Sequence, residues 1–421
     1  MSLLCAQGLF ESSVSGSRNY TLQGNIRSGL LIAGRNDSLY AGDMHARAGV
    51  TLKAEASRFA YGRVDMTLEY RYAGEHDTLD ADIRELYVDL NVGPLHARLG
   101  KQIEIWGRTD AFHPLDNITP RDMRRIYAGT EDMRLGNYLV NGSVNTGGVL
   151  RFQGIWIPVY RADIISLSMF ELPANVVFGG VNAPEAGLKN SAYALRAEIT
   201  TAEYDAGFSY CRSYGLQPGF SAEMQVLPEA GIRYRLTRIP WRQRVYGFDA
   251  AFTAGRWSLR FESALTDPDS AGSYAYVPER AFEWCLGADR AFGPLRLLLE
   301  YHGKYVPALK ELLPPADPSR LMDHYIARYN RLLYRQEEKV RHEIFFRGTL
   351  PLFHETLELE FSFLYHFSAK EYMFAPAVKI DPADGLGIRL GYSVYAGDDE
   401  SLFDMLGRIY NGGFAVVEIA F

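Results

Sequence analysis

The segment that decides the fold is the last one, Gly413-Phe-Ala-Val-Val-Glu-Ile-Ala-Phe421. Every second residue from Gly413 is small or apolar, and Glu418 lies on the opposite face, as successive side chains of a β-strand must. The termini of soluble domains usually fray. A soluble domain therefore has no need for an apolar strand that ends on phenylalanine, and this segment favours a lipid-facing barrel over a soluble sandwich.

The same alternation recurs along the chain, most clearly at 256–266, 294–306, 355–367 and 386–396. Charged residues lie on one face and apolar residues on the other. In a soluble sandwich the polar face would be the outside, whereas in a large barrel it lines the lumen. The terminal segment decides between them, because it resembles the strand by which outer-membrane proteins are recognised for insertion. Phe421 is therefore expected to be the barrel-insertion signal.

Connections between these segments are alternately short and long, which is typical of outer-membrane barrels with short periplasmic turns and long extracellular loops. The expected fold is all-β, a transmembrane antiparallel up-and-down barrel of 18 strands. Two places are open, since 232–236 could be another strand and 161–171 competes with 136–145 for a place in the ladder. Sixteen strands is the alternative. The expected strands are 20–33, 44–55, 59–72, 82–92, 95–105, 136–145, 148–157, 190–200, 203–214, 242–253, 256–266, 281–290, 294–306, 339–350, 355–367, 371–380, 386–396 and 411–421. The expected long loops are 34–43, 73–81, 106–135, 158–189, 215–241, 267–280, 307–338 and 397–410.

Composition supports this assignment and excludes several others. The net charge of -7 with interspersed signs gives no basic footprint for nucleic acid. No window approaches 18 consecutive apolar residues, so a transmembrane helix is not expected. Many of the 27 Tyr, 23 Phe and 5 Trp fall at strand ends, where an aromatic girdle would lie. Cys5, Cys211 and Cys285 show neither zinc spacing nor an even number for a disulfide framework, and no cofactor or metal is expected.

Residues 1–8 resemble the end of a secretory signal peptide, with small residues around Ala6-Gln7-Gly8. We expect them to be a signal-peptide remnant, and a disordered terminus is the alternative. The sequence contains no linker or composition break after this point. Residues 9–421 are therefore expected to form a single barrel domain.

The densest polar and aromatic cluster, 100–125, begins as a strand and then breaks at Pro114 and Pro120. We expect loop 106–135 to fold into the lumen, because its donors and acceptors could pair with a charged wall. It would act as a constriction, with a plug that only stabilises the barrel as the alternative. The expected narrow point consists of Arg98, Gln102, Trp106, Arg108, Asp110, Asp116, Asn117 and Asp122. Lys101 is an anomaly on the apolar face that either snorkels to the interface or is turned inward by a bulge.

The inward face carries both signs of charge, which predicts ion pairs between neighbouring strands rather than a selectivity ring of one sign. The residues assigned to this network are Glu85, Asp89, Arg196, Glu198, Arg260, Glu262, Glu300 and Arg389. Helices are expected in two loops, after Asp317-Pro318-Ser319 and from Ser401 to Ile409. They either pack at the rim or form a lid. No catalytic motif was found, so an enzyme is not expected.

The block 84–122 resembles a family of bacterial outer-membrane barrels of unknown function. The shared features are Gly100-Lys-Gln102, Trp106-Gly107 and the Asp/Pro-rich segment up to Asp122. Alginate-export barrels are a more distant resemblance, although their strongly basic pore is missing. Members are often associated with envelope lipid exporters, which implies periplasmic or inner-membrane exporter components as partners. A barrel would also contact outer-membrane lipid, lipopolysaccharide and the barrel-assembly machinery.

The expected function is a porin-like channel in the bacterial outer membrane. It would pass small or amphipathic solutes or serve as the outer-membrane conduit of an export system. The alternative is a closed barrel that serves as scaffold or adhesin in an envelope complex. An outer-membrane hydrolase is a weaker third class.

Overall fold

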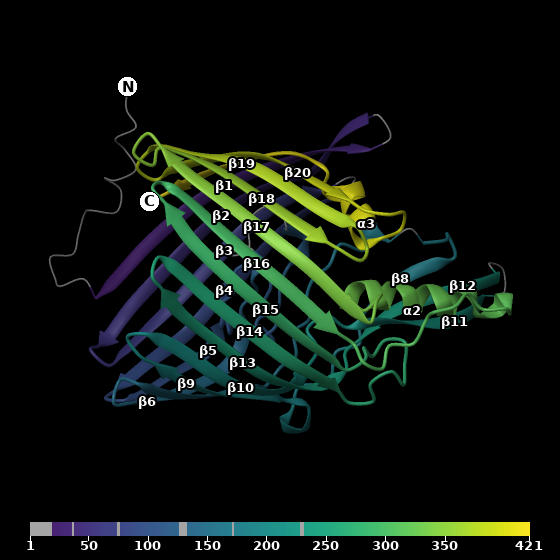
Figure 1. Ribbon diagram of the computed structural model, residues 1–421, viewed down its shortest axis with the longest axis horizontal. Coiled ribbons are helices and arrows are strands. Elements are labelled where there is room, and N and C mark those ends of the chain that lie inside the picture. Colours follow the sequence, from purple (N-terminus) through teal and green to yellow (C-terminus); the bar gives the residue numbers. More distant parts are fainter. Residues whose placement is uncertain (1–18, 36–37, 74–75, 126–132, 171, 228–230) are drawn as a thin grey trace.

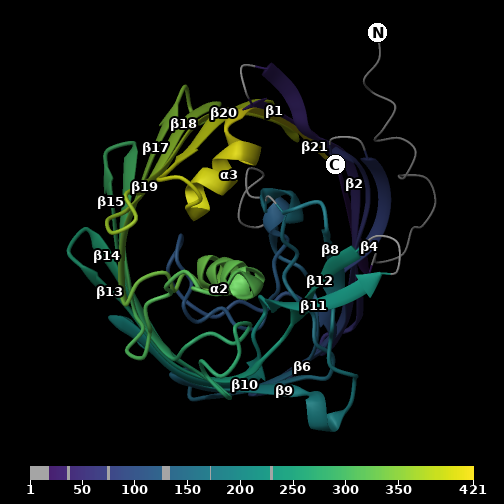
Figure 2. The same cartoon turned by 90° about the vertical axis from the view of Figure 1, so that its right-hand side faces the viewer.

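The computed structural model describes residues 19–421 except 36–37, 74–75, 126–132, 171 and 228–230. Within these residues, eighteen antiparallel strands form one closed barrel, in which β21 pairs with β1 (Figures 1 and 2). The prediction of eighteen strands is confirmed. The strands are β1 (Tyr20–Arg35), β2 (Ser38–Ser57), β3 (Ala60–Ala73), β4 (His76–Val92), β5 (Leu95–Gln102), β6 (Asn137–Thr146), β7 (Leu150–Ile157), β9 (Ala192–Thr200), β10 (Tyr204–Tyr214), β13 (Arg242–Ala254), β14 (Trp257–Pro268), β15 (Ala281–Phe292), β16 (Leu295–Tyr305), β17 (Val340–Leu352), β18 (Leu357–His366), β19 (Glu371–Ala383), β20 (Leu386–Ala396) and β21 (Gly412–Ala420).

The apolar face of the barrel points outward and the charged face points inward. On β16, Leu299 is 44% exposed while its neighbour Glu300 is fully buried. Phe421 follows β21, and its N–H donates to Gly24 O of β1 at 2.9 Å. Its role in insertion stays a prediction. The alternation of apolar and charged residues fits both a sandwich and a barrel. In the structure it belongs to a barrel whose lumen is polar.

Two of the predicted long loops are wrong. Strands β1 and β2 stay paired as far as Arg35 and Ser38, and β3 and β4 as far as Ala73 and His76. The polar composition of 34–43 and 73–81 suggested loops. Ladder hydrogen bonds join main-chain groups, so strands can continue in polar sequence where they extend beyond lipid.

A small second sheet lies at the long-loop end of the barrel, formed by β8 (Val176–Val181), β11 (Gly219–Leu227) and β12 (Gly231–Ile239) (Figure 1). The uncertain segment 232–236 belongs to β12 and does not enter the barrel. Segment 161–171 is not a barrel strand either. Its described part contains the 3₁₀ turn η2 (Leu167–Met169) and an isolated bridge between Ile164 and Asp122.

Both predicted loop helices are present, as α2 (Leu321–Tyr334) and α3 (Leu402–Tyr410), and both lie within the barrel outline in Figure 2. Ser401 caps α3 by accepting the N–H of Asp404 at 3.2 Å. Asp317 does not cap α2 itself. Its Oδ1 accepts the N–H of Ser319 at 2.9 Å within the preceding 3₁₀ turn η4 (Pro318–Arg320).

Two apolar clusters lie inside the barrel. The larger one is at the long-loop end and joins α2, α3 and the second sheet; it includes Phe170, Phe220 and Trp241. The smaller one surrounds Trp106 and Ile118. Among the described residues, no helix is long and apolar enough to cross a membrane. The predicted signal-peptide remnant, 1–8, lies outside the described residues.

Candidate functional site

The described residues of the connection between β5 and β6, 103–125 and 133–136, lie inside the barrel and are called here the lumen segment. Trp106, Leu115 and Ile118 anchor it in the smaller apolar cluster, together with Leu139 of β6 and other wall residues. Gly107 has a φ of +115°, and a Cβ there would lie 2.7 Å from Glu262 Oε1. Only glycine fits both the conformation and the space at this bend.

Two glutamates of the opposite wall hold the main chain of the lumen segment. Glu262 of β14 accepts the N–H groups of Arg108 and Thr109, the latter at 2.6 Å. Glu300 of β16 accepts the N–H groups of 110–112 at 2.6, 2.9 and 3.3 Å. Both carboxylates are fully buried, and hydrogen bonds to an ionised acceptor are roughly twice as strong as neutral ones. The tip of the segment is therefore fixed to the wall through its backbone.

The side chain of Arg108 enters an acidic cluster on β9, β10 and β13. Its Nε donates to Asp249 Oδ1 at 2.5 Å, and its Nη1 donates to Asp205 Oδ2 at 3.2 Å. Glu198 lies 3.6 Å from its Nη2, and Arg196 shares Asp249 at 2.8 Å. Like charges so close together destabilise one another unless cations separate them. Arg108 thus completes the charge balance of a wall that would otherwise be acidic here.

A second ion-pair group lies beside the first. Arg260 of β14 pairs with Asp110 of the lumen segment and with Asp289 of β15. Its Nη1 also donates to the carbonyl of Arg108 at 3.1 Å. The tip therefore supplies a cation to a carboxylate of the wall and a carboxylate to a cation of the wall. These reciprocal ion pairs fix both the position of the tip and its register along the wall.

The second half of the lumen segment is held by its own residues and by the connection after β7, where the N–H of Arg121 donates to Asp163 and the N–H of Met123 donates to Ile164 O. Asp116 accepts a hydrogen bond from Arg121 at 2.8 Å, and Asp122 pairs with Arg124 at 2.7 Å. Asn117 Oδ1 accepts a 3.4 Å hydrogen bond from a glutamine of β13. Asp116 and Asp122 order the segment, and Asn117 links it to the wall.

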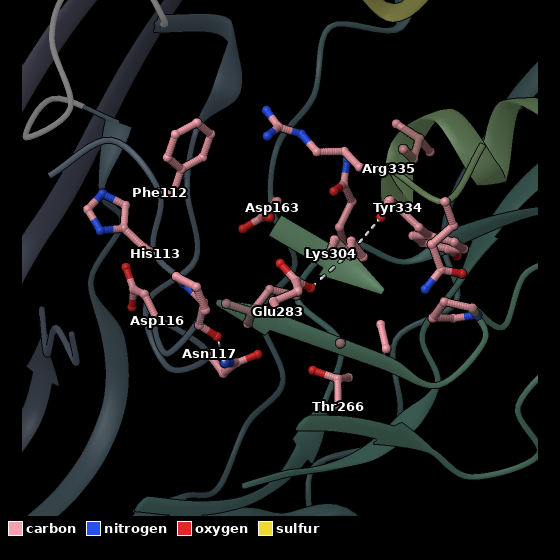
Figure 3. Close-up of a pocket in the computed structure, with 18 of the residues that line it drawn as sticks. Phe112, His113, Asp116, Asn117, Asp163, Thr266, Glu283, Lys304, Tyr334 and Arg335 are labelled. Carbon is pink, nitrogen blue, oxygen red and sulfur yellow. Dashed lines mark hydrogen bonds and ion pairs between the residues drawn. The ribbon is translucent and has the colours of Figure 1, made fainter. Parts of the chain in front are cut away.

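A cavity of about 340 Å³ lies between the lumen segment, strands β13–β16 and the end of α2 (Figure 3). Lys304 Nζ lies 3.1 Å from Glu283 and donates to Tyr334 O at 2.7 Å. His302 lies 3.4 Å from the same glutamate, and its ring stacks on Phe112 with centroids 4.6 Å apart. The cavity presents donors, acceptors and an aromatic surface to any polar solute that enters it.

Asp163 and His113 are two of the ionisable groups that reach this cavity from outside the barrel strands. Burial raises the pKa of Asp163 to about 6, although the N–H of Arg121 donates to it at 2.8 Å and favours the charged form. Burial lowers the pKa of His113 to about 3, and the charge of Arg121 adds to that effect. His113 is therefore neutral near neutral pH, and Asp163 titrates between about pH 5 and 7.

A second cavity, of about 500 Å³, follows β1–β4 and β21, which lie across the barrel from β13–β15 (Figure 2). Arg47, Asp65, Arg84 and Glu418 line it together with threonine and asparagine side chains. We call this side of the barrel the uncovered wall, because the tip of the lumen segment is held on the opposite side. It is polar and carries both signs of charge.

A family profile described as "Protein of unknown function (DUF1302)" matches residues 40–278, more than half of the chain. The chain belongs to this family. The matched part contains nearly all of β2, β3–β14 and the whole lumen segment, including the block 84–122. No curated protein matches the chain in sequence.

Solved structures share the fold of the DUF1302 barrel at very low sequence identity. Acinetobacter baumannii OccAB1 superposes with a TM-score of 0.57 at 12% identity, over 96% of each chain. Pseudomonas aeruginosa OccK5 (OpdH) gives 0.55 at 9% identity, over 96% of this chain and 98% of that one. Pseudomonas aeruginosa OpdL gives 0.55 at 10% identity, over 96% and 99%. This likeness shows the fold.

Four of the eight residues predicted for the narrow point of the DUF1302 barrel either contact the opposite wall or line the first cavity. Arg108 and Asp110 lie at the tip, where the lumen segment meets the opposite wall. Asp116 and Asn117 line the first cavity. The positions of these four residues are consistent with a segment that narrows the lumen, and the constriction stays a prediction.

The other four predicted residues are corrected to supporting positions. Gln102, Trp106 and Asp122 are buried, and Gln102 Nε2 donates to a β6 carbonyl at 3.2 Å. Arg98 lies apart in the wall, 2.8 Å from Asp89. The dense polar and aromatic sequence was read as a lining, but a segment that crosses a lumen also needs partners for its buried polar groups.

The predicted lumen charge network is a set of separate clusters. Arg196 pairs with Glu198 at 2.9 Å, and Arg389 pairs with a glutamate of β18 at 3.0 Å. Glu85 pairs with an arginine of β3 at 3.3 Å. Glu262 and Glu300 were expected to pair with arginines of neighbouring strands, and this was wrong. They bind main-chain N–H groups, because the lumen segment brings those donors to them.

Sequence reasoning missed Asp249, the carboxylate that joins Arg108 to Arg196. A signal was present, because Asp249 lies on the same face of β13 as the buried Val245. An acidic residue on a face of small and apolar residues requires a cation. That cation comes from the lumen segment, which the periodicity of β13 does not reveal. Within the described part of the chain, no group of three or more His, Cys, Asp or Glu side chains could hold a metal ion.

Lys101 is covered, with 7% of its surface exposed, and its Nζ lies 2.9 Å from Asp82 of β4. Two irregularities occur beside it. Gly100 has a φ of +133°, and the pairing of β3 with β4 shifts by one residue at Arg84. The covered Lys101 is therefore not a lysine that snorkels into the interface. The register shift lies in β4 at Arg84, whereas β5 keeps an unshifted pairing with β4 and β6 through Lys101.

Proposed function

We propose that this protein is an outer-membrane channel for small polar or amphipathic solutes. The passage runs between the fixed tip of the lumen segment and the uncovered wall. The observation that carries the proposal is the one-sided placement of that tip by Glu262 and Glu300. A stabilising plug gains nothing from lying against one wall while a polar cavity of about 500 Å³ stays on the other side.

The route passes two polar regions in turn. A solute that enters from the long-loop end meets the first cavity, under α2, and then the tip at Arg108 and Asp110. It leaves along the uncovered wall, past Arg47 and Asp65. Both signs of charge occur throughout, so the channel is expected to discriminate by size more than by charge.

Single-channel recording in planar bilayers tests the proposal. Wild type should conduct, and deletion of 108–130 should raise the conductance because the segment no longer narrows the lumen. A matched deletion of 224–234, at the tip of the β11–β12 hairpin, should leave conductance unchanged. An unchanged conductance in the first deletion would contradict the constriction.

Liposome swelling separates the channel from a closed scaffold or adhesin. A channel admits small sugars and amino acids into proteoliposomes at a rate that falls with solute size. A closed barrel admits none of these solutes. The variant that lacks 108–130 also admits none of them if α2 and α3 close the long-loop end. Wild-type proteoliposomes that exclude every solute would therefore favour the scaffold.

A further inference from the structure

We propose that an outward-facing group of arginines binds the phosphorylated headgroup of a glycolipid of the outer leaflet, of the lipid A type. This inference rests on the proposed outer-membrane location and adds a lipid site to the channel. The group lies at the long-loop end of β10, β13 and β14. Its members, called the arginine patch, are Arg212, Arg242, Arg244 and Arg280.

The register of the strands places the patch on the lipid-facing surface. Arg212 of β10 lies directly opposite Arg244 of β13. Their neighbours Cys211 and Val245 are each 3% exposed and face the lumen, whereas Tyr246 is exposed on the outside. Because side chains alternate along a strand, Arg244 shares the outer face with Tyr246.

An aromatic row fixes the depth of the patch. The rings of Tyr193 and Tyr210 lie 6.2 Å apart, and those of Tyr210 and Tyr246 lie 5.3 Å apart. Such girdles mark the interface between hydrocarbon and headgroups. The row of Arg212 and Arg244 is two residues, about 7 Å, nearer to the long-loop end. It therefore lies at the level of the outer-leaflet phosphates.

The patch keeps an excess of positive charge. Its four arginines face two aspartates, Asp267 and Asp269, of which Arg280 lies 2.7 Å from the first. Arg212 pairs with Asp269. Arg244 lies 3.6 and 3.8 Å from the two aspartates, beyond hydrogen-bonding distance, and its side chain is 46% exposed. Two positive charges stay uncompensated, and the guanidinium of Arg244 can bind a phosphate through two N–H groups.

Arg242 is held in place by groups other than carboxylates. Its guanidinium donates to Lys189 O at 2.8 Å and to Ser191 O at 3.2 Å, and it lies 5.1 Å from the ring centre of Tyr214. These contacts fix its orientation without neutralising its charge. The exposed Lys189 belongs to the same rim and adds a further cation beside the patch. A rim so organised favours a headgroup with more than one phosphate.

Binding of diphosphoryl lipid A to the full-length barrel in detergent micelles tests the site. Arg244→Gln should weaken binding roughly fivefold, and the triple variant Arg212→Gln, Arg244→Gln, Arg280→Gln about a hundredfold, if each arginine contributes about equally. The single variant breaks no close ion pair, so it stays informative if the triple variant fails to fold. Arg290→Gln is the control. Arg290 faces outward over Trp257 at the short-turn end, and the affinity of this variant for diphosphoryl lipid A should equal that of wild type.

Three results with lipid would overturn the site, and a fourth concerns inorganic phosphate. The first three are equal affinities of Arg244→Gln and Arg290→Gln, equal binding of diphosphoryl lipid A and a phosphate-free lipid by wild type, and a change of oligomeric state in Arg244→Gln at unchanged lipid affinity. The last would assign the patch to a second copy of the chain. Inorganic phosphate should compete only at far higher concentration, and equal affinity for it would exclude the lipid. Lipid binding by a barrel that does not conduct would refute the channel and support this site.

Discussion

The two sides of the barrel use their inward-facing charges differently. On β13–β16, Glu262 and Glu300 are fully buried and bind the backbone of the lumen segment. On β1–β4, Arg47 and Asp65 face a cavity. Similar alternating strands therefore produce an anchoring surface on one side and an open polar surface on the other. Contact with the tip of the lumen segment, residues 108–112, and not strand composition, makes the difference, because β3 and β4 contact other parts of the segment through Arg71 with Arg124 O and Glu85 with the N–H of Ile103.

The largest expected effect comes from removing the anchor. Glu262→Ala with Glu300→Ala leaves five main-chain N–H groups without their carboxylates, so unfolding free energy should fall by roughly 5 kcal/mol. Bilayer recordings should show higher and fluctuating conductance, because the tip is released. Glu360→Ala, on β18 and partly exposed, should cost less than about 1 kcal/mol. A steady wild-type conductance in the double variant would contradict the anchoring role.

The bend at Gly107 should come next. Gly107→Ala adds a methyl group at positive φ and within 2.7 Å of Glu262, so we expect a loss of about 3 kcal/mol. Gly142→Ala is the matched control, because a Cβ there meets nothing within 4 Å. It should change stability by less than about 0.5 kcal/mol. Thermal unfolding in detergent measures both, and equal losses would show that the bend carries no strain.

The pKa of Asp163, raised to about 6, predicts a dependence on pH. A folded state that holds the proton more tightly than the unfolded chain is stabilised below the ordinary pKa of the carboxyl. It loses that stability as pH rises through about 6. The contribution of Asp163 to the free energy of unfolding should thus fall by roughly 2 kcal/mol between pH 4 and 7. Chemical unfolding of Asp163→Asn at both pH values should lack this component, and an unchanged pH profile would exclude Asp163 as its source.

The smallest effect on stability is expected at the uncovered wall. Arg47→Gln removes a cation beside the second cavity, so the reversal potential in a salt gradient should move toward cation selectivity. Unfolding free energy should change by less than about 1 kcal/mol. An Arg47→Lys variant keeps the charge and should keep the wild-type selectivity. Unaltered selectivity in Arg47→Gln would place the passage away from this wall.

Sequence reasoning succeeded where local pattern is sufficient and failed where partners are distant. The alternation of β14 and β16 located both strands, because side chains must alternate between lipid and lumen. The helix α3 followed from Ser401 and the apolar spacing after it. The partner of Glu300 could not be found in this way, since its donors lie about 190 residues earlier. Buried supports such as Gln102 were taken for lining residues because sequence does not show burial within a lumen.

The sequence by itself determined the barrel, its strand number and the two loop helices. It also singled out 106–135 as the long loop expected to fold into the lumen. These follow from periodicity and turn chemistry, both of which act between neighbouring residues. Only the tertiary structure decided which wall the lumen segment contacts and what its charges bind. Closing the sheet brings Arg108 within hydrogen-bonding distance of Asp249, and no local rule relates residues so far apart along the chain. The covered position of Lys101 belongs to the same class, because it depends on Asp82 of the neighbouring strand and on the shifted pairing of β3 with β4.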